Sequence, residues 1–158
     1  MAGTILVGVD DSDSAHMAAL KAGALAKALD SELHVISVYS NVISGMPRTR
    51  ASFGDEEVNA VMRAREGKLA QAREYAAETA RGVADELRRK YPSLTVHDRG
   101  VEGAAGPAII EESLRLDVDM VVVGNKRVQG MSRILGSVAN TVARGVECDL
   151  HVVNTSKK

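Results

Sequence analysis

The fold of this chain is decided by the stretch Met120-Val-Val-Val-Gly124-Asn-Lys-Arg127-Val-Gln-Gly130-Met-Ser-Arg-Ile-Leu-Gly136-Ser137-Val138. A short apolar run stops at a glycine. A polar loop with three cations follows, and Gly136-Ser137 opens a helical pattern. This order is typical of a strand, an anion-binding loop and a helix N-terminus, whose free backbone N–H groups favour phosphate. The stretch therefore predicts a phosphate site, although an ordinary glycine-assisted turn between a strand and a helix would have the same pattern.

The rest of the chain alternates between strand and helix patterns. Apolar runs of strand length are separated by segments in which apolar residues recur every three or four positions. The predicted strands cover residues 4–9, 32–39, 94–99, 120–123 and 149–154. The predicted helices cover about 15–29, 56–90 (with a break near Gly67 left open), 107–116 and 137–144. The glycine-rich segment 100–107 is predicted to be a turn. Inward positions are predicted at Ile109, Ile110 and Leu114, and in the last helix at Val138 and Val142.

This alternation predicts an α/β fold, a five-stranded parallel sheet with helices on both faces and right-handed crossovers. The third strand is the most polar, so it is expected at a sheet edge. In open sheets of this kind, ligands bind beyond the carboxyl ends of the strands where the strand order reverses. If the order is 3-2-1-4-5, Asp10 and Gly124 follow the two strands that flank this point.

Length and composition limit the class of protein. The 158 residues are predicted to form a single domain, 1–158. A net charge of −1, one Phe, three Tyr and no Trp argue against a nucleic-acid partner. The single cysteine, Cys148, fits a reducing compartment. Since no signal peptide or membrane span is evident, no membrane partner is expected and the predicted location is cytoplasmic.

Asp10 is the first candidate for a site residue, because it directly follows the first predicted strand. Its carboxylate could accept hydrogen bonds from ribose hydroxyls or bind the Mg²⁺ of a nucleotide. It could equally cap the next helix, beside Asp11, Ser12 and Asp13. The cations of the 124–137 loop could likewise neutralise phosphate or be an ordinary solvated surface.

No catalytic or metal-ligating set is predicted. The histidines have no second ligand at metal-binding spacing, so zinc is not expected; they are His16, His34, His97 and His151. Ser12 and Ser137 have no neighbouring base to activate them. The sequence therefore predicts a binding site without obvious chemistry.

The chain resembles the universal stress protein family over nearly its whole length. The residues that carry the resemblance are Ile5–Ser12, Leu33–Val38, Gly100–Gly103, Asp119–Gly124, Leu135–Val138 and Leu150–Val153. The resemblance implies a sandwich similar to that of adenine nucleotide α-hydrolases. It also implies a homodimer paired through the C-terminal strand Leu150–Val153.

In the nucleotide-binding branch of this family, the motif is a glycine, two residues, a second glycine, about nine residues, then glycine and Ser or Thr. The first glycine matches Gly124 and the closing pair matches Gly136-Ser137. The second glycine is replaced by Arg127, and the spacer that follows has eight residues. Gly130 could take over part of the missing glycine's role.

The resemblance also implies which residues bind the adenine nucleotide, with ATP as the expected ligand. Asp10 would bind the ribose, and the backbone of Val38 would hold the adenine. The pocket lining is expected to include Gly8, Val9 and Val123, with Val101 as a further candidate. The phosphates would be bound by Gly124, Gly136, Ser137 and Val138, together with Asn125, Arg127 and Gly130.

Three functions follow from these observations. The leading hypothesis is a stress-response protein that binds ATP, with or without Mg²⁺, as a sensor or regulator and hydrolyses it slowly at most. The alternative, favoured by Arg127 and the short spacer, is a dimeric interaction module that binds no nucleotide. An α-hydrolase enzyme is disfavoured because no glycine-rich loop follows the first strand. Segment 40–65, with Arg48 and Arg50, is predicted to be either a flexible lid over the cleft or an insertion without a role.

Overall fold

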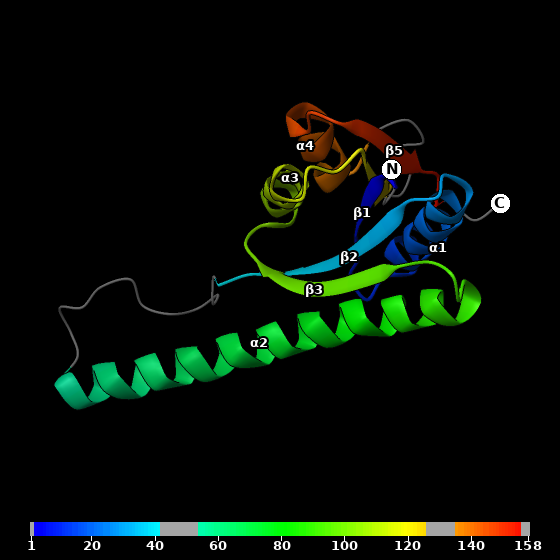
Figure 1. The fold of residues 1–158 in the computed structure, drawn as a ribbon. Helices are drawn as coiled ribbons and strands as arrows, with labels where there is room; N and C mark the ends of the chain where they lie inside the picture. Colours follow the sequence, from blue (N-terminus) through cyan, green and yellow to red (C-terminus); the bar gives the residue numbers. More distant parts are fainter. Residues whose placement is uncertain (1, 42–53, 126–134, 156–158) are drawn as a thin grey trace.

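A computed structural model describes residues 2–41, 54–125 and 135–155 of the chain. Strands and helices alternate in the order β1 (Thr4–Gly8), α1 (Asp13–Ala28), β2 (Glu32–Tyr39), α2 (Asp55–Lys90), β3 (Val96–Glu102), α3 (Ala105–Arg115), β4 (Met120–Gly124), α4 (Ser137–Gly145) and β5 (Asp149–Val153). All neighbouring strands are parallel, and their order is β3-β2-β1-β4-β5 (Figure 1). The predicted fold class, strand order and edge position of the third strand are confirmed.

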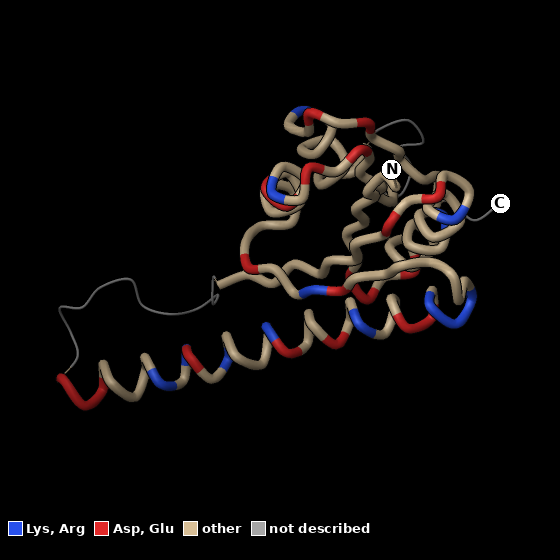
Figure 2. Tube along the Cα trace, in the orientation of Figure 1, with Lys and Arg blue, Asp and Glu red and all other residues tan. Residues whose placement is uncertain are grey.

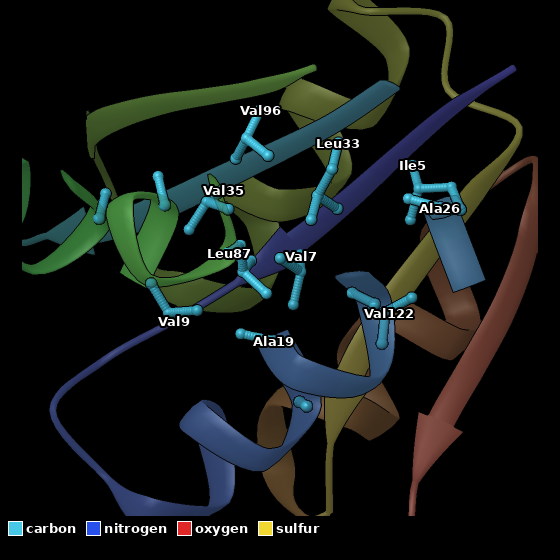
Figure 3. Packing of buried hydrophobic residues seen from close by; sticks show 14 of the residues in the cluster. Ile5, Val7, Val9, Ala19, Ala26, Leu33, Val35, Leu87, Val96 and Val122 are labelled. Carbon is cyan, nitrogen blue, oxygen red and sulfur yellow. The ribbon is translucent and has the colours of Figure 1, made fainter. Parts of the chain in front are cut away.

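Both faces of the sheet are covered by helices, which explains why the central strands are apolar throughout. Alternate side chains of β1 point to opposite faces, so Ile5 and Val7 belong to one core and Leu6 to the other. α1 and α2 pack on the first face, where Ala19 and Leu87 lie close to Val7 (Figure 3). α3 and α4 pack on the second face.

α2 is longer than the sheet it covers. Its buried residues follow a spacing of about four, which places them on one side of the helix: Ala76, Ala80, Ala84 and Leu87. The N-terminal part of α2 extends past the sheet (Figure 1), and charged residues are distributed along it (Figure 2). The helix continues through Gly67 without a break. Residues 55–65 of the predicted lid segment belong to this helix, whereas Arg48 and Arg50 lie outside the described residues.

The predicted turn over 100–107 is too long, because β3 continues to Glu102, the chain turns at Gly103, and α3 begins at Ala105. A Cβ atom on Gly100 would lie 3.1 Å from the backbone nitrogen of Ala77 in α2. The glycine therefore allows α2 to pack closely on the strand. Gly103, with φ of 144°, makes the turn that leads to α3.

Two predicted inward positions are also wrong. Leu114 is 54% exposed, while its neighbours Glu112 and Ser113 are buried. In α4, Val138 is 37% exposed, and Ala139 and Val142 fill the core. None of the helices in the described ranges has the length and apolar character needed to cross a membrane.

Candidate functional site

A cavity of about 240 Å³ lies at the carboxyl ends of β1, β2 and β4. β1 and β4 are the neighbouring strands at which the strand order reverses, which is the usual ligand position in open α/β sheets. The N-termini of α1, α3 and α4 also contribute to the wall. The lining residues are Gly8, Val9, Asp10, Ser14, Ala15, Val38, Ala105, Ile109, Val123, Gly124, Gly136, Ser137, Val138 and Ala139.

The cavity brings together nine of the residues named from the sequence: Gly8, Val9, Asp10, Val38, Val123, Gly124, Gly136, Ser137 and Val138. Val101 does not line it, because its side chain is buried in the core between the sheet and α3. Asn125 lies next to the cavity, and Arg127 and Gly130 lie outside the described residues.

Sequence reasoning missed five residues of the wall. Ser14 and Ala15 stand in the first turn of α1, and Ala105 begins α3. Their position at the cavity could have been predicted, because the N-terminus of a helix that follows a parallel strand lies at the carboxyl edge of the sheet. Ile109 was assigned to the core alone, and Ala139 was not singled out.

The glycine at the end of β4 is required by a neighbouring helix. A Cβ atom on Gly124 would lie 2.9 Å from both the backbone oxygen and the Oγ of Ser14. Contact this close to backbone cannot be relieved by a side-chain rotation, so the start of α1 packs directly on Gly124. The same packing brings Ser14 and Ala15 to the cavity.

The N-terminus of α4 opens into the cavity. Gly136 is the N-cap residue and supplies no side-chain cap, and the first backbone bond of the helix runs from Asn140 N to Gly136 O at 2.9 Å. Ser137, Val138 and Ala139 occupy the first turn, where backbone N–H groups have no partner within a helix. This end of a helix carries a partial positive charge and favours an anion.

A hydrogen-bond network fixes this helix end relative to the sheet. Asn125 Oδ1 accepts a bond from Gly136 N at 3.1 Å, and Asn125 O accepts one from Thr155 Oγ1 at 2.8 Å. The Thr155 hydroxyl also lies 2.8 Å from Ser14 Oγ. Asn125 therefore acts as a positioning residue that connects β4, α1, α4 and the segment after β5.

The structure separates the two roles considered for Asp10. Ser12 is the N-cap of α1, and its Oγ accepts a bond from Ala15 N at 3.2 Å. Asp10 stabilises the turn before this cap, since its Oδ1 accepts a bond from Ser12 N at 2.8 Å. It also lines the cavity, where it is the one acidic side chain among the described lining residues. No histidine, cysteine or lysine is among them.

Residues 1–154 match the model of the universal stress protein family, so the chain belongs to this family, as the sequence predicted. It is similar to universal stress protein MJ0531 of Methanocaldococcus jannaschii. The two are 29% identical over 156 residues, which covers 98% of this chain and 83% of the relative.

Solved structures show the same fold. A universal stress protein in complex with cAMP is 29% identical with a TM-score of 0.64, and 98% of each chain is covered. The hypothetical protein MJ0577 is 21% identical with a TM-score of 0.75, covering 100% of this chain and 99% of the other. An Archaeoglobus fulgidus universal stress protein in complex with dAMP is 18% identical with a TM-score of 0.58, covering 98% of each chain. The last two similarities concern the fold alone.

Proposed function

We propose that this protein binds an adenine nucleotide, ATP in the first place, in the cavity at the ends of β1, β2 and β4, as a sensor or regulator in stress response. The proposal rests on one observation. The strand ends, Asp10 and the N-terminus of α4 converge on a single cavity at the position where the strand order reverses. The complex of a 29% identical family member with cAMP supports the choice of an adenine nucleotide.

The cavity offers a suitable surface for each part of a nucleotide. Val9, Val38 and Ile109 provide an apolar wall for the base. The Asp10 carboxylate can accept bonds from the ribose hydroxyls, and the first turn of α4 can donate backbone N–H groups to phosphate. If Mg²⁺ accompanies the nucleotide, the Asp10 oxygens are the ligand type that it prefers. Because the described wall offers no base apart from this carboxylate, we propose binding rather than catalysis.

The decisive experiment is to denature freshly purified protein and chromatograph the supernatant for a bound nucleotide. In parallel, the melting temperature is measured with added ATP, ADP, AMP and cAMP. A ligand present at a hundred times its Kd stabilises the folded state by about 2.7 kcal/mol, which is a shift of several degrees. Absence of any nucleotide, together with no shift, would contradict the proposal. If the chain is then dimeric, the interaction module is the better hypothesis.

Ser137 allows a test of where the phosphate binds. Ser137→Glu places a negative charge in the first turn of α4, which favours the helix by about 0.3–1 kcal/mol but repels a phosphate. We expect ATP affinity to fall at least about fivefold, because unit charges 4 Å apart repel by about 1–4 kcal/mol between bulk water and a protein surface. Ser137→Gln is the matched control and should retain most of the affinity. Equal affinity in both variants would place the phosphate elsewhere.

We also propose that the protein is a homodimer paired through the edge of β5, Leu150–Val153. At the opposite edge, β3 is covered by α2, whereas β5 ends the sheet. An edge strand has unpaired backbone groups that can pair with a second chain.

A further inference from the structure

A second cluster of polar side chains lies at the opposite end of the sheet. His34 of β2 and His97 of β3 are direct neighbours in the parallel register. Their rings stack with centroids 4.4 Å apart and planes inclined by 23°. Glu32 precedes His34 by two residues, so it points to the same face of the sheet. Its Oε2 lies 3.2 Å from Nε2 of His97.

We propose that Glu32, His34 and His97 form a binding site for Zn²⁺. Each residue offers one ligand atom, and these atoms all lie within 4.8 Å of one another. Over the part of the chain that the structure describes, no other three side chains of His, Cys, Asp or Glu are gathered as closely. Two imidazoles and a carboxylate are a common donor set for zinc with a water molecule as the fourth ligand.

The side chains can reach zinc geometry with small movements. Bonds of 2.0–2.1 Å in a tetrahedral site place the ligand atoms roughly 3.3 Å apart, close to the 3.2 Å between His97 Nε2 and Glu32 Oε2. The remaining separations need to shrink by at most about 1.5 Å. The two rings must rotate out of their stack to direct nitrogen lone pairs at one ion. The side chains of Glu32 and His97 are 46% and 49% exposed, so they can rotate without disturbing the core.

The surrounding charges are compatible with a cation. The guanidinium groups of Arg99 and Arg115 both lie near Oε2 of Glu112, at 3.6 Å and 2.7 Å. Glu112 offsets one of these two positive charges, and the carboxylate of Glu32 offsets the other.

Bound zinc would connect the edge strand β3 to β2. His34 lies four residues before Val38, which is about 13 Å along a strand that rises about 3.3 Å per residue. The zinc site is therefore separate from the nucleotide cavity. Its test is independent of the proposed function, and failure of one proposal leaves the other intact.

The test is calorimetric titration of ZnCl₂ into the full-length protein after metal removal with a chelator. We expect one zinc ion per chain and a higher melting temperature. Excess Mg²⁺ should not displace the zinc, because it prefers oxygen ligands. His34→Gln and His97→Gln should each weaken binding by about tenfold or more, since even outer-shell partners of a metal account for about 10–100-fold.

His16→Gln is the matched control. His16 Nε2 lies 2.7 Å from Oε2 of Glu86, so it forms a histidine–carboxylate pair without a second imidazole. Its variant should bind zinc like the wild type. Unchanged zinc affinity in the His34→Gln/His97→Gln double variant would overturn the proposal, as would an equal loss in His16→Gln.

Nitrogen NMR of the histidine rings in the wild-type protein gives an independent result if a variant does not fold. One equivalent of zinc should shift ring nitrogens of His34 and His97 and leave those of His16 and His151 unchanged. Shifts confined to His16 or His151, or no shift in any ring, would contradict the site.

Discussion

Glu112 is a charged residue in a position that the helical pattern of α3 assigns to apolar side chains. Its side chain is 6% exposed. Arg115 donates to it through Nε at 3.0 Å and Nη2 at 2.7 Å. The hydrogen bonds from Arg115 lower the pKa of the carboxyl group, burial opposes them, and Arg99 adds to the lowering. Leu114 follows Glu112 by two residues, which places it on roughly the opposite side of the helix. Because Glu112 faces the protein, Leu114 faces solvent.

The lowered pKa of Glu112 predicts a pH-dependent contribution to stability. A carboxyl group with a depressed folded-state pKa stabilises the fold above its unfolded-state pKa, near 4.5. That stability is lost as the pH falls through the folded-state pKa. We expect Glu112→Gln to lower the free energy of unfolding by about 1–3 kcal/mol at pH 7, with the difference from wild type shrinking as the pH falls below 4.5.

Urea unfolding of Glu112→Gln and wild type between pH 3 and pH 8 measures this difference. The neighbouring Glu111 is exposed, so Glu111→Gln is a control that should change stability by no more than about 0.5 kcal/mol at any pH. A Glu112→Gln difference that is the same at pH 3 and pH 7 would mean that the charge of Glu112 does not contribute.

Most residues of the candidate site could be named from the sequence because they follow predicted strands. Asp10 comes directly after the first strand, and Gly124 ends the fourth. The physical reason why a particular residue type is required at a position was harder to predict. Gly124 suggested close approach of a ligand, but the atoms nearest to its missing Cβ belong to Ser14. Such a contact joins residues far apart in the chain and leaves no local pattern.

At the scale of single elements, α2 contains two glycines whose replacement tests its two parts. A Cβ atom added at Gly67 or Gly82 would meet no atom within 4 Å. Gly82 lies between the buried Ala80 and Ala84, whereas Gly67 lies nine residues before Ala76, the first buried residue of the helix. Gly82→Ala should raise the free energy of unfolding by about 0.5–1 kcal/mol, because alanine loses less backbone entropy than glycine in a helix.

Gly67→Ala should have a smaller effect on global unfolding, because the extended part of α2 can open while the core stays folded. It should instead slow amide hydrogen exchange of residues near position 67. Denaturant unfolding and hydrogen exchange of both variants measure the two effects. Equal gains in the free energy of unfolding would show that α2 unfolds as one unit with the core.

Element boundaries were predictable only where local chemistry sets them. Asp13 follows the N-cap Ser12, and the start of α1 was close to its predicted position. β3 was placed too early because Gly100 was interpreted as a turn. Gly100 is instead required because α2, which precedes β3 in the sequence, packs closely against the strand at this position. Boundaries that depend on tertiary packing are therefore the ones that the sequence alone misplaced.

At the scale of the whole molecule, the alternation of strands and helices was enough to predict the parallel sheet, but it does not by itself determine the strand order 3-2-1-4-5. The histidine cluster was not predictable, since His34 and His97 are 63 residues apart in the sequence (97 − 34). Only the register between β2 and β3 makes them neighbours. A shift of that register by one residue would turn one ring to the opposite face.

The proposed dimer depends on which backbone groups of β5 face the open edge of the sheet. Asp149 N donates to Asp119 O at 3.2 Å, and Val153 O accepts from Asn125 N at 3.1 Å, so these residues direct their backbone groups toward β4. Orientation alternates along a strand. The N–H groups of Leu150 and Val152 therefore point away from β4, toward the edge where a second chain would pair.

Val152→Pro removes one of these outward donors and keeps the bonds between β4 and β5, a placement that proline tolerates on edge strands. We expect the wild type to sediment as a dimer and the variant to shift to monomer over the same concentration range while remaining folded. His151→Pro is the matched control. It removes a donor that faces β4, so its main effect should be a lower melting temperature. A wild type that stays monomeric at every concentration, or a Val152→Pro variant that dimerises as tightly as wild type, would exclude pairing through this edge.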